Sequence, residues 1–253
     1  MTYALKTERL SKSFGSFRAN DAVSVALPTG ARHALIGPNG AGKTTFVNLL
    51  TGVYAPTSGA IFLLGEDVTR KAQHERVKRG VTRTYQVSRL FPGLTALEAV
   101  VLAILEREGK TRRWWRAASG HSAQVDEAHD LLRRLNLAHD AGRMTRSLPY
   151  GGQRLLEIAL ALATRPKVLL LDEPAAGIPS RESAAVLDVV ASLPDDVTVL
   201  LIEHDMSLVF RFAQRITVLA GGRVLSEGPP AEIAADPRVR EVYLGEGRTG
   251  EHG

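Results

Sequence analysis

Cysteine is absent from the 253 residues of this chain. Disulfide bonds and thiolate metal sites are therefore excluded, and the composition is typical of a protein in a reducing compartment. Aromatic residues are also scarce, at 6%, whereas 44% of the residues are hydrophobic and 23% are charged. These proportions exclude a disordered chain. The length is enough for one α/β domain with an inserted subdomain or for two small domains.

Long apolar runs are missing as well. The longest is about seven residues, at Ala99–Leu105, whereas a membrane-spanning helix needs about 20. Residues 1–8 contain no basic start followed by an apolar core, so we expect no secretory signal. Any association with a membrane is therefore expected to be peripheral.

The charge balance is basic, with a formal net charge of +5 at pH 7. A basic surface can bind nucleic acid or an anionic membrane, but ordinary solvated charge is the commoner reason for such a balance. We therefore expect no nucleic-acid partner. Only residues 110–116 are locally dense in positive charge, and they include Trp114 and Trp115.

One stretch satisfies every fixed position of the phosphate-binding loop G-x-x-x-x-G-K-[ST]. It reads Gly37-Pro38-Asn39-Gly40-Ala41-Gly42-Lys43-Thr44-Thr45, between an apolar strand end at 34–36 and a helix that stops before Gly52. The glycines allow backbone N–H groups to curl around a β-phosphate at the helix N-terminus. Lys43 is expected near the β- and γ-phosphates, and the Thr44 hydroxyl is a suitable ligand for Mg²⁺.

Two continuous apolar runs, 168–171 and 197–202, predict strands buried on both faces of a parallel sheet, joined by a helix at 181–193. Asp172 and Glu173 follow the first run. Because ligands collect at the carboxyl ends of such strands, we expect Asp172 to hold Mg²⁺, directly or through water. Glu173 is expected to polarise an attacking water.

Two further polar residues end expected strands at the same edge. His204 follows the second apolar run and is expected to donate to the γ-phosphate, although a lone histidine is more often a surface or core residue. Gln86 ends a strand expected at 80–86, where its amide is placed to bridge Mg²⁺ and the attacking water. Without the other motifs, this glutamine would carry no signal.

The first residues predict an antiparallel ribbon, with strands at 4–10 and 22–27 and a strand at 59–64 after a turn. Phe14 falls in the loop between the first two strands. An exposed aromatic ring before the phosphate loop suits stacking on a purine, and a packing role for Phe14 is an equal alternative.

A helical insertion is expected at 95–165. It begins at the capping box of Thr95 and Glu98, continues with a helix at 122–135, and ends with a helix from near Gly152. The glycine-rich start of that last helix offers free N–H groups to an anion. Since it lies about a hundred residues from the phosphate loop, we expect it to cap a nucleotide held by a second copy or a paralogue. Its nucleotide contacts are expected from Tyr150, Gly151, Gly152 and Gln153.

The motifs of one family occur here in that family's order. They are the P-loop at 37–45, the Q-loop glutamine Gln86, the family loop at 148–153, the Walker B end at Asp172 and Glu173, and the switch histidine His204. On these motifs the chain resembles the nucleotide-binding subunits of ABC transporters. Further matches, at 83–86, 89–91, 156–159, 174–177, 201–206 and 236–246, make it most similar to the larger ATP-binding subunit of branched-chain amino acid importers.

The resemblance implies an α/β fold: a P-loop NTPase (RecA-like) core with an N-terminal antiparallel β subdomain and an inserted α-helical subdomain. The expected boundaries form one ABC ATP-binding domain, with the core at 1–94 and 166–234, the helical subdomain at 95–165 and a C-terminal extension at 235–253. A two-residue hairpin turn at Gly221-Gly222 is expected near the end of the core.

The resemblance also implies a function. Two cassettes would pair head to tail around two molecules of ATP with Mg²⁺, as a homodimer or a heterodimer, and hydrolysis would move two transmembrane permease subunits. An extracytoplasmic solute-binding protein would take part indirectly. The expected location is peripheral, on the cytoplasmic face of the inner membrane.

The chain departs from the family pattern at two loops. Pro149 replaces the serine that would donate to the partner's γ-phosphate, and 176–179 lacks the usual aspartate of the D-loop. We expect an active ATPase, and the departure leaves open that this family loop serves the weaker site of a heterodimer. The basic stretch with Trp114 and Trp115 is expected to be a solvated loop, with contact to lipid headgroups or a permease as the alternative.

Other functions remain open on the sequence. The cargo of such an importer could be a branched-chain amino acid, urea, an amide or an aromatic acid, because the motor subunit does not touch it. A soluble ABC-type ATPase of translation or DNA repair usually has two cassettes or a long coiled-coil insertion, and neither is present here. A P-loop small-molecule kinase would not need the family loop or His204.

Overall fold

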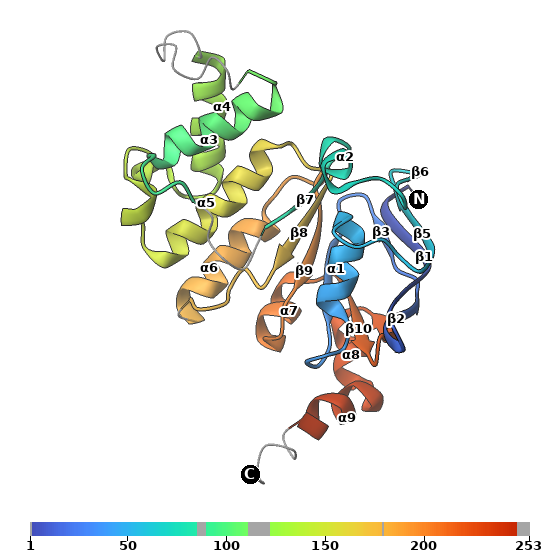
Figure 1. Ribbon diagram of the computed structural model, residues 1–253. Helices are drawn as coiled ribbons and strands as arrows, with labels where there is room; N and C mark the ends of the chain where they lie inside the picture. Colours follow the sequence, from blue (N-terminus) through green and yellow to red (C-terminus); the bar gives the residue numbers. More distant parts are fainter. Residues whose placement is uncertain (1, 85–89, 111–121, 179, 247–253) are drawn as a thin grey trace. The chain divides into compact units, whose positions relative to one another are not determined.

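The computed structural model describes residues 2–84, 90–110, 122–178 and 180–246 (Figure 1). Gln86, Trp114 and Trp115 lie outside the described residues. The chain divides into two compact units. The first unit consists of 1–81, 167–173 and 194–253, and the second of 82–166 and 174–193. The helical subdomain expected at 95–165 lies inside the second unit.

The first unit contains a smaller sheet and all of a larger sheet except the last two residues of its strand β7, which belong to the second unit. The smaller sheet has the order β2-β1-β5-β6, with β3 pairing with β1, and the larger has the order β11-β10-β4-β9-β8-β7. In the smaller sheet the strands are β1 (Tyr3–Phe14), β2 (Phe17–Val23), β3 (Ala26–Pro28), β5 (Ser58–Leu63) and β6 (Glu66–Asp67). In the larger sheet they are β4 (Arg32–Ile36), β7 (Val81–Arg83), β8 (Val168–Asp172), β9 (Thr198–Ile202), β10 (Arg215–Ala220) and β11 (Arg223–Gly228).

The central strands of the larger sheet are parallel, since β10, β4, β9 and β8 pair in parallel registers, whereas β11 pairs with β10 in antiparallel fashion. Every residue of β4, β8 and β9 is buried. This burial confirms the interpretation of the runs at 168–171 and 197–202 as strands covered on both faces. The Gly221-Gly222 turn between β10 and β11 is also confirmed.

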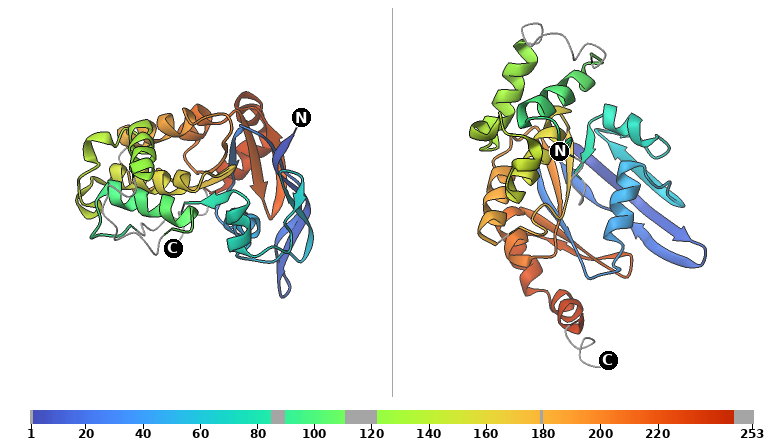
Figure 2. Two further views of the ribbon diagram at one scale, coloured as in Figure 1. Left: turned by 90° about the horizontal axis from the view of Figure 1, so that it is seen from above. Right: turned by 60° about the vertical axis from the view of Figure 1, so that its left-hand side comes forward.

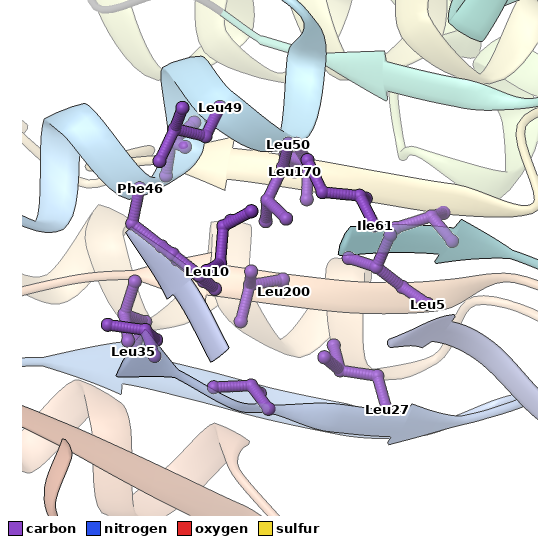
Figure 3. Close-up of a cluster of buried hydrophobic side chains, with 14 of the residues drawn as sticks. Leu5, Leu10, Leu27, Leu35, Phe46, Leu49, Leu50, Ile61, Leu170 and Leu200 are labelled. Atoms are coloured by element: carbon purple, nitrogen blue, oxygen red, sulfur yellow. The ribbon is translucent and has the colours of Figure 1, made fainter. Parts of the chain in front are cut away.

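Helix α1 (Lys43–Thr51) joins the two sheets of the first unit. Its apolar residues Phe46, Val47, Leu49 and Leu50 belong to one buried cluster with residues from both sheets. Figure 3 shows Phe46 and Leu50 among side chains of the smaller sheet, such as Leu10, and of the larger sheet, such as Leu200. Because α1 carries the phosphate loop at its N-terminus, this core fixes the position of the loop.

A buried arginine closes the other end of α1. Arg76, on the short helix α2 (Gln73–Lys78), is almost completely buried, and its Nη1 donates to the carbonyls of Leu49 and Leu50 at 2.6 and 2.8 Å. Its other nitrogens donate to the carbonyls of Lys71 and Thr69. The last turn of α1 has no basic residue of its own. Arg76 therefore supplies the cation that the C-terminal end of a helix favours.

The prediction for the first hairpin was wrong in detail. Strand β1 continues to Phe14, and the turn consists only of Gly15 and Ser16, so Phe14 ends a strand and does not lie in a long loop. The strand predicted at 22–27 is divided into β2 and β3. The break falls at residues 24–25, where side chains replace regular ladder bonds: the Arg9 N–H donates to the Ser24 hydroxyl and the Val25 N–H donates to the Thr7 hydroxyl.

The remaining helices of the first unit are α7 (Met206–Phe212), which follows β9, and α8 (Pro230–Ala235) and α9 (Pro237–Glu246), which follow the edge strand β11. Asp205 caps α7, because its carboxylate accepts from the backbone N–H groups of Ser207 and Leu208. No pattern in the sequence predicts any of these three helices. Each is short, so the apolar periodicity that indicates a helix is weak.

The second unit is mainly helical (Figure 2). It contains α3 (Ala96–Arg107), α4 (Ser122–Arg134), α5 (Tyr150–Ala163) and α6 (Ser180–Ala191), with short 3-10 turns η3 (Ala138–Asp140) and η4 (Thr145–Ser147). Helices α3, α4 and α5 contact one another. The capping box is confirmed, with the Glu98 N–H donating to Thr95 and the Thr95 N–H donating to Glu98.

Helix α5 begins at Tyr150, two residues before the position near Gly152 that the sequence predicted. Pro149 causes the earlier start. Its φ of −54° already suits a helix entrance, and its carbonyl accepts from the Gln153 N–H at 2.9 Å. Among the described residues, no helix combines the length and the apolar character needed to cross a membrane.

Candidate functional site

The parallel strands bring the predicted site residues of the first unit to one edge of the larger sheet. Asp172 pairs in register with Ile202, and Ile202 pairs with Leu35, two residues before Gly37. Neighbouring strands lie about 5 Å apart. The phosphate loop, Asp172, Glu173 and His204 therefore gather where β4, β8 and β9 end, as predicted from the order of their motifs.

The phosphate loop is pressed between two other segments of the first unit. A side-chain carbon on Gly37 would collide with the Leu219 carbonyl of β10, and one on Gly42 would collide with the Ala19 carbonyl of β2. Gly42 also has φ +97°, which L side chains rarely adopt. Gly40, with φ +77°, has no atom within 4 Å of an added carbon. Packing thus requires glycine at positions 37 and 42, while the backbone at Gly40 is open to a ligand.

The N-terminus of α1 lacks the side-chain cap that usually accepts hydrogen bonds from the first backbone N–H groups of a helix. Gly42 is the N-cap residue and offers no side-chain cap, and the first turn contains no acidic residue. Such a helix end favours a bound anion. Lys43 Nζ donates to the carbonyls of Gly37 and Pro38 at 2.6 and 2.9 Å, which places its ammonium across the loop. The Thr44 side chain is exposed and accessible to a ligand.

Asp172 and Glu173 differ in backbone conformation. Asp172 is a buried strand residue, whereas Glu173 has φ +47° in the left-handed region. The Glu173 N–H still donates to the Ile202 carbonyl at 2.9 Å, so the chain turns away from the sheet directly after that bond. A non-glycine residue in this region costs about 1–2 kcal/mol, and such strain is concentrated at functional sites.

His204 lies between two carboxylates. Its Nδ1 is 3.6 Å from Oε1 of Glu173 and 3.8 Å from Oε2 of Glu203. The histidine side chain is 66% exposed, Glu173 is 26% exposed and Glu203 is 2% exposed. Glu203 accepts from the His204 backbone N–H at 3.2 Å. Glu203 therefore supports the local backbone, and Glu173 is the carboxylate that solvent reaches.

Two contacts of the phosphate loop were missed by the sequence analysis. The Asn20 amide, on β2, donates to the Gly42 carbonyl at 3.2 Å, and the Gly222 N–H donates to the Ala41 carbonyl at 3.1 Å. Asn20 is fully buried. An added carbon on Gly222 would lie 2.8 Å from the Ala19 carbonyl. No local signal marks Asn20, and the glycine pair at 221–222 predicted only a turn.

The predicted family-loop residues belong to the second unit. Tyr150 is half-exposed, and its hydroxyl is hydrogen-bonded to Nη2 of Arg154 at 2.9 Å. The Arg154 side chain is buried and pairs with Glu157 at 2.9 Å. The Tyr150 ring also lies beside Gly177, where an added carbon would be 3.4 Å away. Gly151 is buried and Gln153 donates to the Leu148 carbonyl. Tyr150 thus links the family loop to the loop at 174–178 within this unit.

A buried histidine lies in β4, four residues before the phosphate loop begins. His33 is fully buried, and its Nε2 lies 2.7 Å from Oγ1 of Thr217. The Thr217 hydroxyl donates to Glu227 at 2.9 Å, so it accepts from Nε2–H of His33. Nδ1 of His33 has no hydrogen-bond partner among the described residues. Burial lowers the pKa of His33 to about 4, against the opposing effect of Glu227 and with a smaller contribution from Arg215.

We expect this histidine to make the first unit sensitive to acid. The unfolded chain takes up the proton near pH 6.5 and the folded chain only near pH 4, so stability is present above pH 6.5 and is lost as the pH falls. Between pH 7 and 5 the free energy of unfolding should fall by about 2 kcal/mol more in the wild type than in His33→Gln. Urea unfolding at both pH values measures the difference.

The exposed His139 provides the control for this prediction. His139→Gln should keep the pH dependence of the wild type. An equal loss of stability on acidification in His33→Gln and in the wild type would contradict the assignment to His33.

Comparison with known proteins identifies the family. Residues 20–176 match the model of the ABC transporter family, and 223–249 match the model described as branched-chain amino acid ATP-binding cassette transporter. The chain is 40% identical to the high-affinity branched-chain amino acid transport ATP-binding protein BraF of Pseudomonas aeruginosa. It is 38% identical to LivG, the protein of the same description in Escherichia coli. Each alignment covers 96% of this chain and 98% of the relative.

Solved structures agree with this family. The ADP conformation of an ATP-binding cassette of an ABC transporter has a TM-score of 0.84 and 30% sequence identity, covering 97% of this chain and all of that one. A dimeric cassette in a post-hydrolysis state, bound to ADP and Pi, has a TM-score of 0.73 and 25% identity, covering 89% of this chain and 98% of that one. The predicted P-loop NTPase fold is therefore confirmed. Together with the site geometry, these matches show that the chain belongs to the ABC transporter family as an ATP-binding, ATP-hydrolysing cassette.

Proposed function

We propose that this chain is the motor subunit of an importer for branched-chain amino acids. The assignment of the cargo rests on the alignment of nearly the whole chain with BraF and LivG, whose descriptions name transport of branched-chain amino acids. The match at 223–249 supports the same subfamily from the C-terminal part. We place the subunit on the cytoplasmic face of the inner membrane, bound to two permease subunits that an extracytoplasmic solute-binding protein supplies with cargo.

The phosphate loop residues 37–45 bind the triphosphate of ATP in this proposal. The uncapped N-terminus of α1 and the open backbone at Gly40 suit an anion, and the loop carries no opposing acidic group in the first turn of the helix. Lys43 would exchange the two loop carbonyls it now contacts for phosphate oxygens. Phe14, which is 44% exposed, offers its ring to the purine.

Thr44 and Asp172 are the groups we assign to Mg²⁺. Among the described residues, no three acidic or histidine side chains form a cluster that would hold a metal ion alone. The two oxygen donors Thr44 and Asp172 suit Mg²⁺, which in nucleotide sites is held by one or two protein oxygens together with phosphates and water. The bound ion would neutralise charge that develops on the phosphates. Gln86, the third predicted ligand, belongs to the part of the chain that is not described.

In this proposal Glu173 orients the attacking water and His204 contacts the γ-phosphate. The Glu173 carboxylate is partly exposed at the end of β8 and within 3.6 Å of His204. It accepts a hydrogen bond from the water and orients it for attack. The exposed His204 donates to the γ-phosphate oxygens. Because α7 begins two residues later, this contact links the presence of the γ-phosphate to the start of that helix. Positioning of this kind supplies most of the catalysis in phosphoryl transfer.

A second cassette completes the site. We propose that Tyr150, Gly151, Gly152 and Gln153 contact the nucleotide held by the partner cassette, which is either a second copy or a paralogue. Pro149 stands at the N-cap of α5 without a side-chain hydrogen bond, so the backbone and Tyr150 must provide the polar contacts there. ATP would close the pair, hydrolysis would reopen it, and the permease subunits would follow.

Uptake of labelled leucine tests the function and the cargo together. Cells whose only copy of the chain carries Lys43→Met should lose leucine uptake, whereas cells with Lys78→Met, an exposed change on α2, should keep it. Labelled urea, a labelled amide and a labelled aromatic acid are supplied to the same cells in parallel as competitors of leucine, so that their own uptake is measured too.

The outcomes separate the cargo from the motor. If leucine uptake is unchanged in the Lys43 variant while uptake of a competitor is lost, the motor assignment stands and the branched-chain cargo is wrong. If no uptake changes, the transport function is wrong and a soluble ABC-type ATPase takes its place.

A further inference from the structure

Lys12, Phe14 and Tyr54 form a small cluster at the open end of the first hairpin. The rings of Phe14 and Tyr54 meet edge to face, with centroids 5.4 Å apart and planes at 78°. Lys12 Nζ lies over both rings, at 5.0 Å from the centroid of Phe14 and 5.8 Å from that of Tyr54. One ammonium is thus placed against two aromatic faces, a favourable cation–π arrangement.

The ammonium is also fixed by the backbone. Lys12 Nζ donates to the Ala55 carbonyl at 2.8 Å, so its position is set by a hydrogen bond as well as by the rings. A lysine with no such anchor would sample many rotamers. Lys12 lies over the Phe14 ring and Tyr54 meets it in a T-shaped contact, and Phe14 remains 44% exposed. Part of the ring surface therefore stays accessible to a ligand although two neighbours contact it.

The cluster is connected to the phosphate loop through β2. Lys12 of β1 pairs in register with Asn20, and the Asn20 amide donates to the Gly42 carbonyl. Tyr54 follows α1, and its N–H donates to the Asn48 carbonyl within that helix. Both ring-bearing segments are thus attached to the element that binds the triphosphate. A nucleotide bound at the loop would have its base within the same unit as these rings.

We propose that Lys12 is a positioning residue for recognition of the nucleotide base. It holds the Phe14 ring, with Tyr54, in one orientation, in which the exposed part of the ring is available to a purine. The inference rests on the proposed contact between Phe14 and ATP. A cation behind the ring also withdraws electron density from it, which strengthens stacking on an electron-rich base such as adenine.

The expected effect is a loss of affinity confined to the base. Lys12→Met keeps the length of the side chain and removes the charge, and it should raise the Kd for ATP about three- to tenfold. Phe14→Ala should raise it about five- to 150-fold, which corresponds to the loss of one stacked base. Both variants should bind inorganic tripolyphosphate as the wild type does, because the phosphate loop is intact.

Equilibrium binding of ATP and of tripolyphosphate at fixed ionic strength measures these changes. Lys12→Arg should restore ATP affinity, since a guanidinium also stacks on aromatic faces. Phe17→Ala is the matched control, because Phe17 pairs with Phe14 across the turn and is more exposed, at 64%, without a recorded contact to Lys12 or Tyr54 among the described residues.

Each outcome decides between the two ideas. If Phe14→Ala weakens ATP binding and Lys12→Met does not, the role of Lys12 is wrong and the contact between Phe14 and the base stands. If Phe14→Ala leaves ATP binding unchanged, the base contact is wrong and the inference fails with it. If Lys12→Met weakens ATP and tripolyphosphate equally, its effect arises at the phosphates, which overturns the proposal.

Discussion

Glu173→Gln should lower the rate of ATP hydrolysis by about 10²–10⁴-fold, the range of a lost general base. The amide keeps the shape of the side chain but cannot take a proton from water. Affinity for ATP should stay close to that of the wild type. Glu173 follows β8 and is not one of the phosphate-loop residues 37–45 that bind the triphosphate. Single-turnover hydrolysis and equilibrium ATP binding, measured on the same preparations, check both statements.

Glu203→Gln is the matched control for this change. Both carboxylates lie at similar distances from His204 Nδ1, 3.6 and 3.8 Å, but Glu203 is almost fully buried and supports the His204 backbone. We expect its removal to affect stability more than the hydrolysis rate. The assignment of the base would be wrong if Glu203→Gln abolished hydrolysis with the fold intact while Glu173→Gln remained active.

Lys43→Met should weaken ATP binding about 100-fold, because a charge-assisted contact to phosphate oxygens contributes about 3 kcal/mol. ADP should lose less affinity than ATP, since it lacks the γ-phosphate. The lysine also bridges the Gly37 and Pro38 carbonyls, so part of the loss arises from a looser loop. Comparison of the Kd for ATP and for ADP in the variant separates the two contributions.

Lys78→Met serves as the control here too, because it removes one positive charge from an exposed position of the first unit. It should leave both Kd values unchanged. Equal losses for ATP and ADP in Lys43→Met would mean that the lysine does not contact the γ-phosphate.

The sequence predicted those parts of the site that carry a local signal. The phosphate loop follows from its glycine spacing between β4 and α1, and the positions of Asp172 and His204 follow from apolar runs that end in polar residues. Parallel pairing of β4, β9 and β8 then brings them together by a general rule of such sheets.

Other parts depend on contacts between distant segments, and no local pattern reports them. Arg76 looks like any charged residue of a short helix, yet it is buried against the end of α1. Asn20 likewise acquires its partner, the Gly42 carbonyl, and Lys12 acquires the Ala55 carbonyl only when the first two strands pack beside the segments that flank α1. The boundary error at Phe14 has the same origin, because cross-strand pairing extends β1 beyond its apolar pattern.

The close approach of backbone at Gly37, Gly42 and Gly222 has a consequence for biosynthesis. The phosphate loop leaves the ribosome early, but its shape depends on the Leu219 carbonyl and on the Gly222 N–H, which are synthesised near the end of the chain. A nascent chain that stops before β10 would carry the complete P-loop motif without the surface against which it folds. Competence to bind nucleotide should therefore arise late in translation, when almost the entire cassette has emerged.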